Sequence, residues 1–361
     1  MSATALDVEF RPLVVPATID APDADDFIEM VRVRNIAYRE ISGHDDDTLS
    51  AAELLPHYQP DPYEVRHVWL AIVDGVIVGR VGVDIPLEEG SKTAFWLIEL
   101  RKDAWGGGIG SAAYRLVEQT AREHGRTVLQ SWALHPAVDG PQLSPPTGFG
   151  TIPEDHAARF YLRHGYALEQ IARNSALDLT APLDRIDRVL AVARAAATDY
   201  RVVQWEAPTP PEYVEGYAWM KSRMSTDAPA AALEFDEETW DAARVARHDA
   251  LYLDGGRRLL VTAAQHIATG ELCAFNELAL GSDPAAATQQ EDTLVLKEHR
   301  GHRLGALVKA EGLLTWHRLM PETPRVVTYN AEENRPMLDI NEALGFEPVA
   351  YEGAWKKVLA D

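Results

Sequence analysis

Residues 95–125 read FWLIELRKDAWGGGIGSAAYRLVEQTAREHG, and this stretch decides the fold. It begins with an apolar run, residues 95–100, that predicts a buried strand. A glycine-rich loop follows, Trp105-Gly106-Gly107-Gly108-Ile109-Gly110. After the loop, apolar residues at helical spacing predict an amphipathic helix that ends at Gly125. Its predicted buried face consists of Ala113, Leu116, Val117, Thr120 and Ala121.

A second copy of this order occurs in the C-terminal half of the chain. There the apolar residues 293–296 lead into the loop Arg300-Gly301-His302-Arg303-Leu304-Gly305. The helix that follows places Leu307, Ala310 and Leu314 on one face. The chain therefore contains an internal repeat of a strand, a glycine-bearing loop and a helix.

A predicted β-hairpin precedes each copy. In the first half, residues 68–73 and 76–83 flank the pair Asp74-Gly75, which favours a two-residue turn. In the second half, residues 259–264 and 272–280 flank a turn near Thr269-Gly270. Each copy closes with a further strand, a short helix and a glycine-aromatic pair: residues 127–134 and Gly165-Tyr166 in the first, residues 325–330 and Gly345-Phe346 in the second.

The register of the repeat can be checked by subtraction. The loop glycines Gly110 and Gly305 are 305 − 110 = 195 residues apart, whereas Gly165 and Gly345 are 345 − 165 = 180 apart. The first half has 15 additional residues in the stretch HPAVDGPQLSPPTGFG. Its prolines and glycines predict an inserted loop.

These patterns predict an α/β protein with two domains of similar design. We place the first domain at residues 1–180, a connecting helix at 181–199 and the second domain at 200–361. Residues 208–247 show no clear pattern, except that 236–247 favours a helix.

Composition excludes several classes of protein. The chain has 361 residues, and 34 Lys+Arg against 56 Asp+Glu give a net charge of −22. This charge argues against binding to nucleic-acid phosphates. The single cysteine, Cys273, excludes a disulfide framework. No signal peptide or membrane-spanning run is present, so we expect a cytoplasmic protein without a membrane partner.

Both loops suit the binding of phosphate. A glycine-rich turn before a helix presents several unpaired N–H groups at the positive end of the helix dipole. The dinucleotide fold is a competitor, but residues 127–134 contain no acidic residue to bind a ribose. The nucleotide-binding P-loop needs Gly-Lys-Ser/Thr, and neither loop has it.

With these two loops and their flanking elements, the sequence resembles the GNAT acetyltransferase superfamily, and the resemblance occurs twice in one chain. That family's pyrophosphate loop is Arg/Gln-x-x-Gly-x-Gly/Ala. In the first half the glycines fit, but Trp105 stands at the Arg/Gln position. In the second half Arg300 and Gly305 fit, while Arg303 replaces the first glycine.

A second family pattern supports the resemblance. It is a helix that Asn opens, with a tyrosine often four residues before a closing Gly-Phe/Tyr. HAARFYLRHGY places Tyr161 four residues before Gly165, and NAEENRPMLDINEALGF places Asn341 four residues before Gly345. The resemblance covers about residues 65–180 and 255–361, and it implies two tandem GNAT domains, each with a mixed, mostly antiparallel sheet flanked by helices.

The resemblance implies transfer of an acetyl group from acetyl-CoA to the amine of a small molecule by direct attack, without a metal. It assigns Tyr161 as the proton donor, with Asn341 at the matching place in the second half. It assigns the following residues to CoA binding: Gly106, Gly107, Gly108, Ile109, Gly110 and Ser111, then Arg300, Gly301, His302, Arg303, Leu304, Gly305 and Asn334.

The family often takes its base from a strand carboxylate. Asp84 and Glu277 are the candidates, and Glu99 is a weaker alternative. A carboxylate facing the interior is costly unless it has a role or a partner, although strand alternation can also point each of them to solvent.

Several alternatives stay open from the sequence. One domain can be catalytic and the other a scaffold, or the protein can be a non-catalytic acyl-CoA sensor. The physiological role can be amine detoxification or a biosynthetic step, and the protein can be a monomer or a homodimer.

The acidic run Asp45-Asp46-Asp47 favours a cationic amine if it lines the acceptor entrance. Cys273 is expected to be an inert buried thiol, and the spacing of His299, His302 and His317 indicates no metal site.

Overall fold

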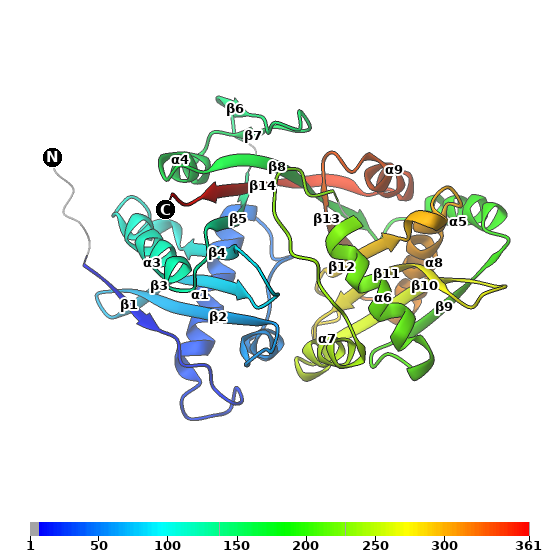
Figure 1. Cartoon of the computed structure of the whole chain (residues 1–361), viewed down its shortest axis with the longest axis horizontal. Helices are drawn as coiled ribbons and strands as arrows, with labels where there is room; N and C mark the ends of the chain where they lie inside the picture. Colours follow the sequence, from blue (N-terminus) through cyan, green and yellow to red (C-terminus); the bar gives the residue numbers. More distant parts are fainter. Residues whose placement is uncertain (1–6, 137, 228, 361) are drawn as a thin grey trace. The chain divides into compact units, whose positions relative to one another are not determined.

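The computed structural model describes residues 7–136, 138–227 and 229–360, and they form an α/β fold of two compact units (Figure 1). The first unit takes the chain up to Ile171, together with Ala231–Glu234 and the C-terminal segment from Tyr351. The second unit comprises Ala172–Ala230 and Phe235–Ala350. The chain passes between the units inside two strands, so each unit is completed by a strand segment from the other half of the sequence.

The first unit contains a sheet in the order β1-β2-β3-β4-β5-β14. All neighbouring strands are antiparallel except β4 and β5. Its elements in chain order are β1 (Val8–Pro12), α1 (Asp25–Ser42), α2 (Ala51–Leu54), η1 (Leu55–Tyr58), β2 (Glu64–Val73), β3 (Val76–Pro86), β4 (Thr93–Leu100), η2 (Lys102–Ala104), α3 (Ile109–Glu123), β5 (Val128–His135), β6 (Gln142–Leu143), β7 (Ile152–Pro153), α4 (His156–Arg163) and β8 (Ala167–Asp178), with β14 (Glu347–Val358) entering from the end of the chain.

The local signals of the first unit explain its hairpin. Asp74 and Gly75 both have positive φ angles, 49° and 78°, as a type I′ turn requires between two twisted strands. Val81, Val83 and Ile85 then alternate into a core that also contains the α3 and α4 side chains. In its described residues, the predicted insertion after β5 contains the short strand β6, which pairs with β7 just beyond the insertion.

The second unit repeats the design with the strand order β8-β13-β12-β11-β10-β9. Here β12 and β13 are the parallel pair. Its further elements are α5 (Asp184–Ala196), β9 (Tyr200–Glu206), α6 (Pro211–Asp227), α7 (Ala242–Asp254), β10 (Arg258–His266), β11 (Leu272–Leu280), β12 (Thr288–Val295), η3 (Lys297–His299), α8 (Leu304–Leu319), β13 (Arg325–Ala331) and α9 (Arg335–Leu344).

The helices between the two repeats were the least predictable elements. The helix expected within 181–199 is α5, whose Ile186, Leu190 and Ala193 belong to the same core as α8. The helix expected at 236–247 begins later, at Ala242, after the side chain of Asp241 caps it. α6 was not predicted. Its Gly216 leaves room for Leu272, whose side chain lies 3.2 Å from where a Cβ would be.

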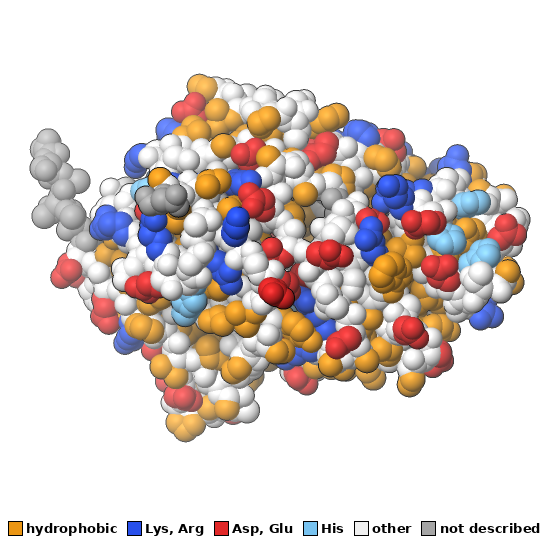
Figure 2. Space-filling view, viewed as in Figure 1, with side chains coloured by type: hydrophobic (Ala, Val, Ile, Leu, Met, Phe, Trp, Pro, Cys, Tyr) orange, Lys and Arg blue, Asp and Glu red, His pale blue; other side chains and the backbone are white. Residues whose placement is uncertain are grey.

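None of the helices in the described residues is both long and apolar enough to cross a lipid bilayer. Acidic, basic and apolar side chains are interspersed on the face shown in Figure 2.

Candidate functional site

The glycine loop of the first unit leaves a run of backbone N–H groups without acceptors among the described residues. Gly106 and Gly108 have φ angles of 81° and 84°, which only glycine adopts without strain. The flanking N–H groups are used internally, since Trp105 donates to the Lys102 carbonyl and Ala112 to the Gly108 carbonyl. Among the described residues, no acceptor pairs with the six N–H groups from Gly106 to Ser111. They lie at the start of the 15-residue helix α3, where an anion is favoured.

Trp105, which replaces the family's Arg/Gln, has a structural role. Its ring stacks on His156 at 4.5 Å between centroids, and its Nε1–H donates to the Leu100 carbonyl at 3.0 Å. The indole thus connects the end of β4 to the start of α4.

The second unit reproduces this loop with a different side chain. Gly301 and Arg303 have φ angles of 92° and 56°, at the register of Gly106 and Gly108. In the part of the chain that the structure describes, the N–H groups from Gly301 to Ala306 again have no acceptor. Arg303 therefore accepts a left-handed backbone at a cost of about 1–2 kcal/mol. Arg300 donates from Nε to the Val295 carbonyl at 3.3 Å.

Next to each loop, the parallel strands stop pairing. β4 and β5 pair only from Thr93 to Phe95 and from Val128 to Gln130, although both strands continue beyond these residues. β12 and β13 pair over two residues only, Thr288 with Val326 and Gln289 with Val327. The diverging segments carry main-chain groups that no ladder bond between these two strands uses. Each loop thus lies at the end of a strand that has separated from its parallel neighbour.

Tyr161 lies beside this divergence in the first unit. Its hydroxyl is 2.7 Å from the Oγ of Ser131, the first β5 residue after the paired segment. Its ring stacks on Trp355 at 4.8 Å with an interplanar angle of 3°. Burial raises the pKa of Tyr161 well above its usual range; the Ser131 hydrogen bond lowers it and the charge on Glu352 raises it further. The phenol therefore keeps its proton at neutral pH.

Glu352 was not singled out in the sequence. Burial, and then the negative charge of Asp47, raises the pKa of Glu352 to about 7. No described side chain forms an ion pair or hydrogen bond with its carboxylate. Glu352 alternates along β14 with Gly353 and Trp355, so it faces away from Tyr161 and toward the acidic run that contains Asp47. A carboxyl group titrating near neutral pH suits a general base.

A His–Asp pair was also missed. The Nδ1 of His135, at the end of β5, lies 3.1 Å from the Oδ1 of Asp155, which caps α4. Its Nε2 and the Nε1 of Trp355 are buried, and neither has a hydrogen-bond partner among the described residues. A Cβ on Gly353 would lie 2.8 Å from the Trp355 nitrogen and 3.0 Å from the His135 nitrogen. Glycine is therefore required where these two atoms converge.

The carboxylates predicted as bases in the first unit are held by arginines. Asp84 accepts from the Nε of Arg66 at 2.7 Å, and Arg66 also bonds the His57 carbonyl. Asp84 alternates with Val83 and Ile85, which share a core with Tyr161, so it faces the opposite side of the sheet.

Glu99, the weaker candidate, forms an ion pair with the Nε of Arg80 at 2.5 Å. Burial alone would raise the pKa of Glu99, but the Arg80 charge outweighs it and the pKa lies below its ordinary value. Such a carboxylate is a weak base.

In the second unit Glu277 belongs to a buried charge cluster. It accepts from the Tyr217 hydroxyl and lies 3.2 Å from the Nζ of Lys221, which also bonds Asp292 at 2.6 Å. The ladder between β11 and β12 shifts at Glu277, so that Glu291 and Asp292 together oppose it. Lys221 offsets the cost of burying the Glu277 carboxylate. It is the kind of partner expected from the sequence for an interior carboxylate.

Asn341 occupies the Tyr161 register without a phenol. It accepts from the Nζ of Lys309 at 2.7 Å and donates to the Oδ1 of Asn330 at 2.7 Å. Burial lowers the pKa of Lys309 to about 7. Asn334, assigned to CoA binding, stands before α9 with no side-chain cap bond.

We predict that Lys309→Met stabilises the protein near pH 7 by about 3 kcal/mol. A lysine whose folded-state pKa is lowered carries a cost that grows as pH falls from about 10 to 7. Loss of the hydrogen bond to Asn341 reduces this stabilisation by about 1 kcal/mol. Denaturant melts at pH 7 and pH 10 check this, because the stabilisation should be largest at pH 7. Equal stabilisation at both pH values would contradict a neutral buried amine.

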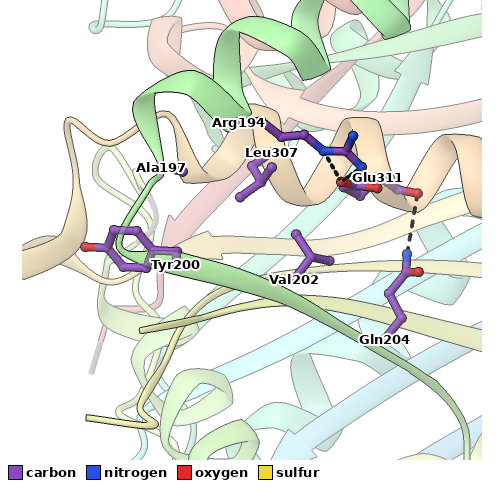
Figure 3. A pocket seen from close by; sticks show the side chains of 7 residues that line it. All are labelled: Arg194, Ala197, Tyr200, Val202, Gln204, Leu307 and Glu311. Carbon is purple, nitrogen blue, oxygen red and sulfur yellow. Dashed lines mark hydrogen bonds and ion pairs between the residues drawn. The ribbon is translucent and has the colours of Figure 1, made fainter. Parts of the chain in front are cut away.

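A cavity of about 390 Å³ lies in the second unit between α5, β9 and α8 (Figure 3). The side chains of Arg194 and Glu311 point toward one another in it and form an ion pair at 2.5 Å. Gln204 lies beside them, and Tyr200 lies at the far end. The cavity contains neither Lys309 nor the Glu277 cluster, so we do not place the reaction there. Its lining residues are Arg194, Ala197, Tyr200, Val202, Gln204, Leu307 and Glu311.

Comparison with known proteins bears on the family and the fold. Residues 30–139 match the model of the Acetyltransferase (GNAT) family. A solved tandem GNAT protein from the clavulanic acid biosynthesis pathway, without AcCoA, is 26% identical, and the match covers 98% of this chain and 99% of that chain with a TM-score of 0.75. A GCN5-related N-acetyltransferase from Sphaerobacter thermophilus is 15% identical over 98% of this chain and 96% of that chain, with a TM-score of 0.62. No curated protein sequence matches this chain.

These matches confirm the predicted resemblance to the GNAT superfamily and the predicted fold class. Residues 30–139 match a GNAT acetyltransferase domain, and the chain as a whole has a tandem GNAT fold with a mixed, mostly antiparallel arrangement of strands. This fold supports acyl transfer in general.

Proposed function

We propose that this tandem GNAT protein transfers an acetyl group from acetyl-CoA to the amine of a small molecule. The observation that carries the proposal is the paired loop geometry. Each unit presents six consecutive N–H groups that find no acceptor among the described residues, at the start of a long helix and beside strands that diverge. A packing turn needs neither feature, whereas a pyrophosphate with its attached chain uses both.

The loops fit acetyl-CoA by the chemistry of their donors. The N–H groups from Gly106 to Ser111 would hold its pyrophosphate in the first unit, and those from Gly301 to Ala306 in the second. Arg300 and Arg303 add positive charge beside the second loop, which suits a further phosphate. Bound acetyl-CoA supplies the thioester carbon that the acceptor amine attacks directly.

We assign the chemistry to the first unit. Tyr161 is a protonated phenol that Ser131 and Trp355 hold in one orientation, and it would give its proton to a leaving thiolate. Glu352 would take the proton from the acceptor ammonium, in place of Asp84 and Glu99, whose carboxylates are paired with arginine. In the second unit Asn341 cannot act as an acid, so we propose that this unit serves as a CoA-binding scaffold.

The acceptor is an amine drawn to negative charge. Asp47 lies near enough to Glu352 to raise its pKa, and it belongs to the acidic run Asp45-Asp46-Asp47. A cationic amine would be attracted to this side of the sheet. The tandem neighbour from the clavulanic acid pathway supports a biosynthetic acceptor over a detoxified one.

We predict that Glu352→Gln lowers kcat about 100-fold, since general bases contribute about 10²- to 10⁴-fold. The wild-type rate should rise with pH through about 7, as the carboxyl ionises, and the variant should lose this limb. Initial rates across pH 5–9 check this, with Glu347→Gln, an exposed carboxylate on the same strand, as the control.

The same variant has a stability signature. A carboxyl whose folded-state pKa is raised stabilises the fold at low pH, and this contribution is lost as pH rises from about 4.5 to 7. The melting temperature of Glu352→Gln should therefore be higher than that of the wild type at pH 8 and equal to it at pH 4. Parallel melting at both pH values would contradict the titration assigned to Glu352.

The experiment that tests the proposed function has two readouts on one protein sample. CoA should raise the melting temperature, since a ligand at 100 times its Kd stabilises the native state by about 2.7 kcal/mol. Acetyl-CoA should then release free thiol only when an amine is added. No melting shift with millimolar CoA contradicts the cofactor, and a shift without thiol release favours the acyl-CoA sensor.

A further inference from the structure

Three side chains with metal-binding atoms meet at one edge of the second unit, outside the loop and the Glu277 cluster. Glu271 precedes β11, Cys273 lies in β11, and His299 ends η3. One ligand atom from each lies within 4.8 Å of the other two. Figure 2 shows histidine and acidic side chains gathered over the region of the β10–β11 hairpin. Sequence spacing did not predict this cluster, because the fold brings residue 299 back to the hairpin.

The distances are close to those of a bound metal ion. Tetrahedral Zn²⁺ holds nitrogen, oxygen and sulfur donors about 3.3–3.7 Å apart. The Nε2 of His299 already lies 3.6 Å from the Oε2 of Glu271. All three donor atoms lie within 4.8 Å of one another, so the widest separation exceeds this range by at most about 1 Å. Glu271 can close it by rotation, because its side chain is 48% exposed while that of His299 is 17% exposed.

The histidine also has the support that a metal ligand requires. The hydroxyl of Tyr200 lies 2.9 Å from the Nδ1 of His299. Ligating histidines usually hydrogen-bond through the second ring nitrogen, which fixes the tautomer and aims the other nitrogen at the metal. When the Nδ1–H of His299 donates to the Tyr200 oxygen, the lone pair of Nε2 is free for the side where Glu271 and Cys273 lie.

The backbone holds the sulfur in the same place. The Leu296 N–H donates to the Cys273 carbonyl at 2.9 Å, which fastens the start of η3 to β11. The Cys273 thiol points toward the Glu271 carbonyl at 3.3 Å. All three donors thus converge on the short turn between β10 and β11.

The first unit provides an internal comparison. Subtracting the repeat offset of 195 from 271, 273 and 299 gives positions 76, 78 and 104, which are Val76, Val78 and Ala104. None of these side chains can bind a metal. The three donors are therefore absent from the matching place in the other copy of the fold, as expected for a feature that the fold itself does not need.

We propose that Glu271, Cys273 and His299 bind one Zn²⁺ ion, with water as the fourth ligand. Thiolate, imidazole and carboxylate form a donor set that zinc prefers, and the two anionic ligands balance its charge. The ion fastens η3, and with it the first residue of the loop at Arg300, to the β10–β11 hairpin. The site is independent of the proposed acetyl transfer, and its test uses no acetyl-CoA.

The test is a Co²⁺ titration of the whole chain after treatment with a chelator. The wild type should bind one Co²⁺ per chain and gain a near-ultraviolet sulfur-to-cobalt absorption band, which Zn²⁺ then removes by displacement. Cys273→Ser should lose the band. His299→Ala and the surface change Glu271→Gln should each weaken Zn²⁺ binding by at least about tenfold. His317→Ala, which removes a histidine from α8, is the matched control and should bind as the wild type does.

The outcomes are separable from folding and from catalysis. Glu271→Gln alters an exposed side chain, so a weakened site in a variant that melts as the wild type does supports the proposal. Absence of the band in the wild type overturns it. Persistence of the band in Cys273→Ser, or unchanged Zn²⁺ affinity in both His299→Ala and Glu271→Gln, overturns it as well.

Discussion

Gly108→Glu is expected to abolish CoA binding at the first loop. No atom of the residues that the structure describes lies within 4 Å of a Cβ at this position, so the side chain itself fits. The new carboxylate would face six N–H groups that would otherwise receive a pyrophosphate, and like charges there repel. The left-handed backbone, with φ of 84°, adds strain of about 1–2 kcal/mol. Titration calorimetry should show an affinity at least 100-fold weaker, or one fewer CoA bound per chain.

The second unit supplies the matched control for this variant. Arg303 stands at the register of Gly108 and already adopts a left-handed backbone, with φ of 56°. Gly108→Arg therefore introduces the same strain with the opposite charge and should keep CoA affinity within about tenfold. Equal losses in the Glu and Arg variants would show that strain, and not charge, weakens the site. Full affinity in Gly108→Glu would show that the loop is only a turn.

Tyr161→Phe is expected to lower kcat by more than tenfold while CoA affinity and the fold stay unchanged. The substitution removes one hydroxyl and its bond to Ser131, but it keeps the ring stacked on Trp355. General-acid help is worth about 10²- to 10⁴-fold. Steady-state rates together with CoA titration separate the loss of proton transfer from loss of binding.

Tyr114→Phe is the control for Tyr161→Phe. Tyr114 is buried in the same core, but its hydroxyl donates to Glu118 of α3 and accepts from Lys357 of β14. Its loss should leave kcat within about threefold of the wild type. Asn341→Ala should likewise lower kcat less than Tyr161→Phe does. If Tyr161→Phe turns over normally while Arg300 or Glu277 variants are inactive, the second unit is catalytic and our assignment of the units is reversed.

The parts of the fold that could be predicted are those with local signals. Asp74-Gly75 specifies its hairpin through two positive φ angles, and the α3 stripe specifies a buried face. The exchange of strand segments between the halves has no such signal. Residues 351–358 pair with β5 of the first unit, although they follow the second repeat in sequence. The apolar pattern of a strand does not predict which sheet the strand will join.

The candidate site divides in the same way. The loops and Tyr161 could be found because their spacing is local. Glu352 could not be found, because its raised pKa comes from burial and from Asp47, which lies 305 residues away in the sequence (352 − 47 = 305). His135 and Asp155 meet only because β5 ends beside the start of α4. Asp84 and Glu277 were chosen as carboxylates on strands, and their arginine and lysine partners became known only from the fold.

The two units use one backbone design for different side chains. At the Tyr161 register the second unit has Asn341, bonded to the buried amine of Lys309. At the Gly108 register it has Arg303, and at the Ala104 register it has His299. These differences support a division of labour in which the first unit performs the reaction and the second contributes binding.

The most direct test of the proposed acetyl transfer is amine-dependent release of free thiol from acetyl-CoA. Purified protein is mixed with acetyl-CoA and a panel of primary amines, cationic and neutral, and thiol is followed with a chromogenic reagent. We predict release that saturates with at least one amine, is faster with cationic acceptors, and falls more than tenfold in Tyr161→Phe. A protein that binds CoA but releases no thiol with any amine in the panel would contradict the proposed activity and favour an acyl-CoA sensor.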